Sequence, residues 1–170
     1  MLQQRSRRTI IKGLIYMLFM AFCLVSNGHG LLVRGGAGAA SSAVDGEGLD
    51  TIDPVELLGL LKASKADRPL VLSVGPKLLF QQAHIAGAEY VGAASTSSGI
   101  DTLRARVKSL PRDRVVVLYC GCCPWSRCPN VRPAYKELLA LGFTRVKLLR
   151  IEDDFGTDWV NKGYPSVKVQ

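Results

Sequence analysis

Hydrophobic positions along this chain alternate between short continuous runs and helical repeats. Leu70-Val-Leu-Ser-Val74 and residues 114–119 are almost wholly apolar, which is typical of strands buried on both faces. Between residues 100 and 110, Leu103, Val107 and Leu110 recur every three or four residues, which indicates one apolar helix face. Strands that alternate with helices in this way predict a parallel sheet with helices on both faces.

The ends of several elements are also marked. Asp53-Pro54 is a good helix start, with Asp as the N-cap and Pro in the first helical position, and Gly142 closes a later helix. Residues 84–88 are expected to form a turn, and Tyr164-Pro165 to end the domain. The expected strands are residues 70–74, 89–91, 114–119 and 145–150, and the expected helices are residues 54–65, 77–83, 100–110, 130–141 and 156–162.

The N-terminal part of the chain has a different pattern. Four basic residues precede the apolar run at residues 14–25, which is the layout of a secretory signal and is short for a spanning helix. The Gly-, Ala- and Ser-rich stretch that follows has no apolar period and is typical of a flexible tether. We therefore expect a signal peptide or signal anchor at 1–28, a tether at 29–50 and one folded domain at 51–170. Export predicts a periplasmic or other extracytoplasmic location, with membrane contact only through the N-terminal segment.

The net charge of +8 first suggests a nucleic-acid partner, but its distribution does not. The 170 residues include 22 basic and 14 acidic ones, and five basic residues but no acid lie before residue 40: Arg5, Arg7, Arg8, Lys12 and Arg34. The domain itself is therefore nearly balanced, and we expect no nucleic-acid binding. Aromatic residues make up only 7% of the chain, which does not favour a base-stacking surface.

Cysteine is concentrated in one place. Four of the five cysteines fall within nine residues, directly after the most apolar strand: Cys120, Cys122, Cys123 and Cys128. Buried cysteines that serve only as small apolar residues would be scattered through the core segments. In parallel sheets the chemistry lies at the C-terminal ends of the strands, and Cys120 occupies that position. The sequence therefore predicts a functional cysteine loop.

A cysteine between a strand end and a helix N-terminus faces backbone N–H groups and the positive end of the helix dipole, which favour a thiolate. Cys120 is the candidate nucleophile. The candidate substrate-binding residues lie in the same loop: Gly121, Cys122, Cys123, Trp125, Ser126 and Arg127. The amides of residues 121–126 would form an anion cradle, and Arg127 and Arg132 would add positive charge near an anionic sulfur substrate.

Three chemistries fit such a loop. The first is sulfur transfer through a persulfide on Cys120. The second is dithiol redox work, since Cys120-Gly-Cys-Cys123 is a C-x-x-C between a strand and a helix. The third is a non-enzymatic thiolate module for a soft metal such as copper or mercury, or for a partner protein. Zinc ranks last because adjacent cysteines in one short loop suit tetrahedral coordination poorly, and no metal or other cofactor is expected.

From residue 52 to residue 165 the chain resembles the rhodanese family. The most specific match is Phe80-Gln-Gln-Ala-His-Ile-Ala-Gly-Ala88, which is similar to the family segment F-x-x-G-H-I-x-G-A. Val115-Val-Val-Leu-Tyr-Cys120 resembles the strand that ends in the catalytic cysteine of the family. The other similar segments are residues 52–57, 69–74, 141–146 and 163–165, together with Trp159.

The resemblance implies a three-layer α/β/α fold with a mostly parallel central sheet, and a sulfurtransferase of the thiosulfate type. Cys120 would attack the outer sulfur of a small donor such as thiosulfate and pass it to a thiol or cyanide acceptor. Two departures separate this chain from the family pattern. Ser73-Val74-Gly75 stands where the family usually has Asp-x-Arg, and Gly142 lies 22 residues after Cys120, which makes the loop longer.

The longer loop keeps other roles open. Cys123 or Cys128 would act as a resolving cysteine that converts an intermediate on Cys120 into a disulfide, with a redox partner protein to reduce it. A likeness to the thioredoxin site, in Cys120-Gly-Cys-Cys-Pro124, keeps a thiol–disulfide oxidoreductase of Cys120 and Cys123 as the alternative function. The rhodanese fold is favoured because thioredoxin does not account for the segment at residues 84–88. His84 and Trp159 are expected to be structural, and Trp125 either to line the pocket or to pack the loop.

Overall fold

The computed structural model describes residues 43–44 and 48–168. The predicted leader and most of the predicted tether lie outside these residues. Within the described part, no helix has both the length and the hydropathy needed to cross a bilayer.

A six-stranded sheet forms the centre of the domain, in the order β1-β2-β7-β6-β3-β5. Its strands are β1 (Ala43–Val44), β2 (Asp50–Ile52), β3 (Leu70–Ser73), β5 (Glu89–Tyr90), β6 (Val116–Tyr119) and β7 (Val146–Leu149). All neighbours pair in parallel except β1 and β2, which pair antiparallel. The mostly parallel sheet predicted from the alternating pattern is therefore confirmed.

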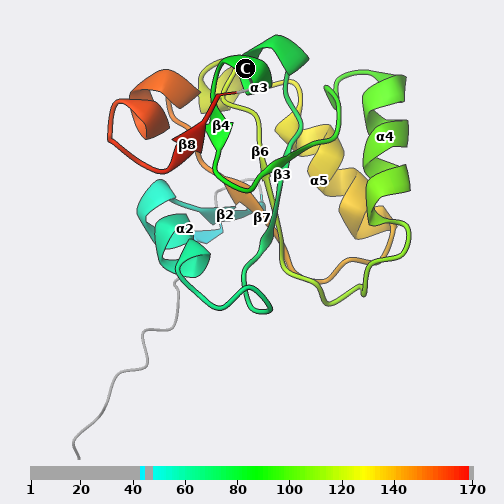
Figure 1. The fold of residues 1–170 in the computed structure, drawn as a ribbon. Coiled ribbons are helices and arrows are strands. Elements are labelled where there is room, and N and C mark those ends of the chain that lie inside the picture. Colours follow the sequence, from blue (N-terminus) through cyan, green and yellow to red (C-terminus); the bar gives the residue numbers. More distant parts are fainter. Residues whose placement is uncertain (1–42, 45–47, 169–170) are drawn as a thin grey trace, which may run out of the picture. The chain divides into compact units, whose positions relative to one another are not determined.

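Helices cover both faces of this sheet (Figure 1). Helices α4 (Ser97–Val107) and α5 (Val131–Ala140) lie on one face, and α2 (Pro54–Leu61) lies on the other. Alternate residues of β6 contribute to two separate cores. Leu118 packs with Leu103 of α4 and Leu138 of α5, whereas Val117 packs with Leu57 of α2. Because β6 is buried on both faces, its sequence is a continuous apolar run.

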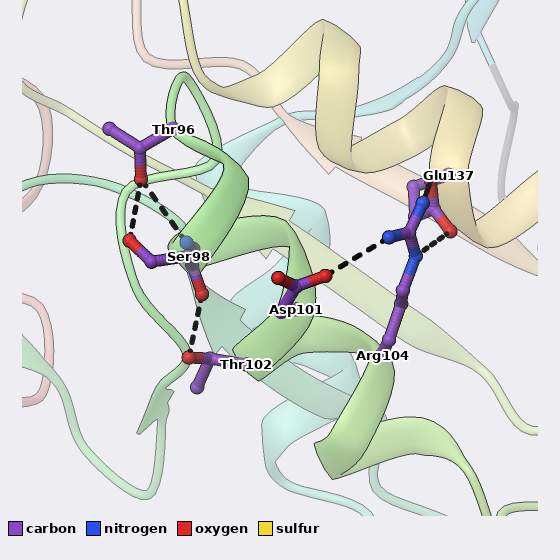
Figure 2. A network of polar contacts seen from close by, with 7 residues as sticks. Thr96, Ser98, Asp101, Thr102, Arg104 and Glu137 are labelled. Atoms are coloured by element: carbon purple, nitrogen blue, oxygen red, sulfur yellow. Dashed lines mark hydrogen bonds and ion pairs between the residues drawn. The ribbon is translucent and has the colours of Figure 1, made fainter.

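Polar contacts join the two helices on the first face (Figure 2). Thr96 is the N-cap of α4, and its hydroxyl accepts from the Gly99 amide at 3.1 Å. Farther along α4, Arg104 donates from Nε and Nη2 to the two carboxylate oxygens of Glu137 in α5, at 2.7 and 3.0 Å. This two-point contact fixes the two helices relative to each other, and α5 begins directly after the cysteine loop.

The expected long elements are present, with ends shifted by a few residues. The helix predicted to reach residue 65 ends at Leu61, and the one predicted for residues 100–110 spans Ser97–Val107. The remaining helices are α3 (Lys77–Gln82), the 3-10 turn η1 (Trp125–Arg127) and η2 (Gly156–Val160), which is a π-helix.

Short strands are where the structure departs from the sequence expectation. The predicted turn after α3 contains β4 (His84–Ile85), which pairs antiparallel with β8 (Ser166–Val167). Tyr164-Pro165 was therefore wrong as the end of the domain, since β8 follows it. Strands β1 and β2 were not predicted either. Two- or three-residue strands are held by their partners and have too few positions to show a period.

Candidate functional site

Cys120 directly follows β6 at the C-terminal edge of the sheet and is 5% exposed. Gly121 turns the chain with a φ of +72°, and a Cβ there would lie 2.6 Å from Phe155 Cβ. Only glycine suits that backbone and that contact. Gly75, just after β3, faces the cysteine closely, since a Cβ there would lie 2.8 Å from the Cys120 sulfur. The two glycines therefore make the space in which this sulfur sits.

The structure brings three of the four loop sulfurs together. The Sγ atoms of Cys120, Cys122 and Cys128 all lie within 4.8 Å of one another. Cys120 Sγ lies 3.1 Å from Cys122 Sγ, and Cys122 Sγ lies 3.3 Å from Cys123 Sγ. None of the four loop cysteines is in a disulfide. The predicted pair of Cys120 and Cys123 is therefore not the closest pair, because Cys122 and Cys128 are the sulfurs gathered with Cys120.

Asn130 is the polar residue that contacts this cluster, and sequence reasoning did not select it. It is 2% exposed and stands at the N-cap position of α5, yet its side chain does not cap that helix. Its Nδ2 donates to Cys120 Sγ at 3.3 Å and to Cys122 Sγ at 3.8 Å, while its Oδ1 accepts from the Ser95 amide at 2.9 Å. Both ends of the amide are thus satisfied, and its orientation is fixed with the NH₂ group toward the sulfurs.

Of Cys128 and Cys120, Cys128 is the one whose thiolate form the surroundings favour. The hydrogen bond with Cys120 and those from the backbone amides of Asn130 and Val131 lower the pKa of Cys128 to about 5, against the effect of burial. Amides at the start of a helix favour a thiolate in this way. The same contact with Cys128, followed by burial, raises the pKa of Cys120. The start of α5 therefore favours a thiolate on Cys128, and the raised pKa of Cys120 favours its protonated form.

Two neighbouring groups are also held in their neutral forms. Burial, followed by a hydrogen bond with Cys122, raises the pKa of Cys123 to about 12. Burial raises the pKa of Tyr119 to about 12, and its hydroxyl accepts from the Ile85 amide at 3.3 Å. Both shifts favour the protonated forms of these two groups.

The rest of the predicted loop divides into packed and exposed residues. Trp125 is buried against the core beside α5, and its amide donates to the Glu152 carbonyl at 3.0 Å. Ser126 and Arg127 are exposed. The guanidinium of Arg132 lies 5.5 Å from the centre of the Trp125 ring and donates to the Trp125 carbonyl. Trp125 therefore packs the loop, and Arg132 lies against it.

Two members of the predicted cradle of amides from residues 121–126 cannot donate to a ligand. The Trp125 amide is already bonded to Glu152, and Pro124 has no amide hydrogen. The Cys122 amide does donate to the Cys120 sulfur. In the part of the chain that the structure describes, this loop amide and the side chain of Asn130 both donate to Cys120.

Solved structures share this fold at low sequence identity. The Alr3790 protein from Anabaena sp. is 19% identical, with a TM-score of 0.53, over 69% of this chain and 92% of that one. The BH2092 protein from Bacillus halodurans is 20% identical, with a TM-score of 0.53, over 70% and 77% of the two chains. The solution structure of the rhodanese-like domain of Alr3790 is 21% identical, with a TM-score of 0.51, over 69% and 78%. A search of curated proteins found no match.

Comparison with models of sequence families identifies the family. The model of the rhodanese-like domain matches residues 53–150, which are more than half of the chain. The match runs from the N-cap of α2 to the end of β7. The matched region includes the strand that ends at Cys120 and the whole cysteine loop. The resemblance inferred from the sequence is therefore confirmed, and the chain belongs to the rhodanese-like domain family.

Proposed function

We propose that this domain is a sulfurtransferase that carries sulfane sulfur as a persulfide on Cys120. The observation that supports it most is the position of Cys120 in a rhodanese-like domain, at the end of a central parallel strand with its sulfur facing the Asn130 amide at 3.3 Å. Hydrogen-bond donors fixed toward a sulfur stabilise negative charge on it and on an atom added to it. A persulfide anion on Cys120 would place its charge in that donor field.

The chemical step is a displacement at sulfur. The Cys120 sulfur forms a bond to the outer sulfur of a donor such as thiosulfate, and the bond from that sulfur to the sulfonyl sulfur breaks. Sulfite leaves with the electron pair of the broken bond and takes the cysteine proton as hydrogensulfite. Cyanide or a thiolate then attacks the outer sulfur of the persulfide, and Cys120 is released as a thiolate.

The neighbouring sulfurs give this domain a second way to release the outer sulfur of the persulfide. Cys122 Sγ lies 3.1 Å from Cys120 Sγ, and the Cys128 sulfur lies within 4.8 Å of both. Attack of either thiolate on the Cys120 sulfur would form a disulfide and release hydrosulfide, with no outside oxidant. An external dithiol would then reduce the disulfide. This route assigns the resolving role to Cys122 or Cys128 in preference to Cys123.

The test is sulfur loading followed by intact mass. The full chain carries Cys23→Ser, so that all remaining cysteines lie in the loop. It is reduced and incubated with thiosulfate, and its intact mass is then measured. We expect a gain of about 32 Da that cyanide removes and that Cys120→Ser abolishes. Cys123→Ser is the matched control, because it changes one cysteine of the same loop and should keep the adduct.

Dithiol–disulfide exchange is the second candidate, and the short distance between Cys120 Sγ and Cys122 Sγ favours it. The same experiment separates the two. A loss of two hydrogens that a reductant reverses, with neither a sulfur adduct nor release of sulfite from thiosulfate, would reject sulfur transfer from thiosulfate. The cysteine pair would then follow from which single variant, Cys122→Ser or Cys128→Ser, prevents the loss.

A further inference from the structure

We propose that Cys120, Cys122 and Cys128 form a three-thiolate binding site for Cu(I). The three Sγ atoms come from the end of β6, from the loop and from the turn before α5, and all lie within 4.8 Å of one another. Two of these residues are buried and the third is partly buried, so a bound ion would be largely shielded from water. This site needs only the geometry of the sulfurs and does not depend on sulfur transfer.

The spacing of the sulfurs fits a small ion in trigonal coordination. Thiolate sulfurs lie about 2.3 Å from a bound zinc, and a similar length in a planar three-sulfur site holds the sulfurs about 4 Å apart. The observed separations run from 3.1 Å, between Cys120 and Cys122, up to the 4.8 Å limit. Adjustments of roughly 1 Å would therefore seat the ion. Soft sulfur ligands select Cu(I), Zn and iron–sulfur clusters over harder ions.

A closed zinc site requires four ligands, whereas among the described residues three sulfurs lie mutually within 4.8 Å. Cys123 is outside the group of mutually close sulfurs, although it lies next to Cys122. Asn130 presents its NH₂ group to the sulfurs, while its carbonyl oxygen is held by the Ser95 amide. An amide nitrogen that donates hydrogen bonds is not a metal ligand. Three sulfurs satisfy Cu(I), and this favours Cu(I) over Zn(II).

Cu(I) would bind the three sulfurs as thiolates, and the protons of those that are thiols in the free protein, Cys120 among them, would pass to solvent. The surroundings of the three sulfurs also suit coordinated thiolates. Asn130 donates to Cys120 and Cys122, and the Asn130 and Val131 amides donate to Cys128. Such outer hydrogen bonds orient metal ligands and offset the excess negative charge of a three-thiolate site. Bound Cu(I) would occupy the Cys120 sulfur, so metal and persulfide cannot share the site. If Cys120 does carry sulfur, Cu(I) would inhibit its loading.

The test measures Cu(I) directly. The full chain with Cys23→Ser, kept reduced and without oxygen, competes with bicinchoninate for Cu(I). We expect one ion per chain and three sulfur neighbours at about 2.3 Å by X-ray absorption. Cys122→Ser and Cys128→Ser should each weaken binding more than about 100-fold, beyond the loss that outer hydrogen bonds produce. Cys123→Ser should retain the wild-type affinity within about threefold and the three sulfur neighbours.

Three results would overturn the site. One is a loss of Cu(I) affinity in Cys123→Ser as large as that in Cys122→Ser. The others are coordination of Cu(I) by two sulfurs in the chain without loop substitutions, and displacement of Cu(I) by Zn(II) at equal concentration. Circular dichroism shows which variants fold, and Cys122, the partly buried ligand, is the substitution on which the result depends. Thiosulfate loading of the same variants is scored separately. Cu(I) binding without sulfur loading rejects the proposed function alone, and loading without Cu(I) binding rejects this site alone.

Discussion

Gly75 shows how a single residue shapes the site. It lies just after β3, beside β6 in the sheet, and the Cys120 sulfur occupies the space that a side chain there would need. Its backbone also approaches the Cys120 carbonyl, which would lie 3.2 Å from an added Cβ. In the family pattern this position usually carries arginine. With no side chain at this position, Gly75 leaves room for the Cys120 sulfur.

Gly75→Ala should therefore disturb both stability and reactivity. The added methyl group forces the Cys120 sulfur to move, and overpacking of this kind costs about 1–3 kcal/mol in the free energy of unfolding. Displacement of a reacting atom by about 1 Å can lower a rate up to about 100-fold, so we expect sulfur loading to slow at least tenfold. Urea unfolding and the rate of adduct formation measure the two effects.

Gly59→Ala is the matched control. Gly59 lies within α2, where an added Cβ meets nothing within 4 Å. This change should raise the free energy of unfolding by about 0.5–1 kcal/mol and leave loading unaltered. Equal loading rates in the two variants would show that Gly75 does not constrain the nucleophile.

At the scale of elements, ion pairs join α4 to its neighbours near the site. Arg104 joins α4 to Glu137 of α5 (Figure 2), and Arg106 joins the same helix to Glu89 of β5, with Nη2 and Oε1 2.8 Å apart. The segment between β5 and α4 contains Ser95, whose amide holds Asn130. Contacts along α4 therefore support the residue that donates to the cysteine cluster.

The pair of Glu89 and Arg106 should make stability depend on pH. The hydrogen bond from Arg106 lowers the pKa of Glu89 below 4.5, so the folded protein favours the ionised carboxylate. The contribution is present above pH 4.5 and is lost as pH falls through the lower folded pKa. Because both side chains are partly exposed, we expect less than about 1 kcal/mol at pH 7.

A double-mutant cycle of Glu89→Gln and Arg106→Gln, followed by urea unfolding, measures this coupling. The coupling energy should be positive at pH 7 and vanish toward pH 3, where protonation of Glu89 removes its charge. A coupling as large at pH 3 as at pH 7 would mean that packing, and not charge, joins the two residues.

At the scale of the whole domain, the sheet separates two hydrophobic cores that share β3, β6 and β7. Leu103 and Trp125 belong to one core, and Leu57 and Trp159 belong to the other. Trp159 is fully buried and its indole N–H donates to the Pro165 carbonyl at 3.0 Å. Since alternate residues of the central strands serve both cores, neither core can lose its order without the other.

A substitution that destabilises one core should therefore shift the unfolding midpoint equally for a probe in either core. Leu103→Ala removes a fully buried side chain and should cost about 2–5 kcal/mol. We would add Leu103→Ala to two variants that each keep one tryptophan, Trp125→Phe and Trp159→Phe. The urea midpoint, followed by the fluorescence of the remaining tryptophan, should fall by the same amount in both. Different midpoint shifts from the two fluorescence signals would show that the cores unfold separately.

The long elements of this fold were predictable because each is marked locally. Residues 70–74 and 114–119 are apolar runs long enough to specify buried strands, and Asp53-Pro54 marks the start of a helix by its own chemistry. The pair β4 and β8 was not predictable. Each has two residues, and they meet only because the rest of the chain brings residue 84 next to residue 167.

The sequence by itself determined which residue stands at the end of the central strand. An apolar run followed at once by Cys120, together with the segment at residues 80–88, was enough to predict the family and the nucleophile position. Only the tertiary structure decided the environment of that sulfur. Gly75 and Asn130 reach it from separate segments, and the hydrogen bond with Cys120, together with the amides at the start of α5, lowers the pKa of Cys128. Contacts and charges of this kind depend on distances between remote residues, which spacing along a chain does not encode.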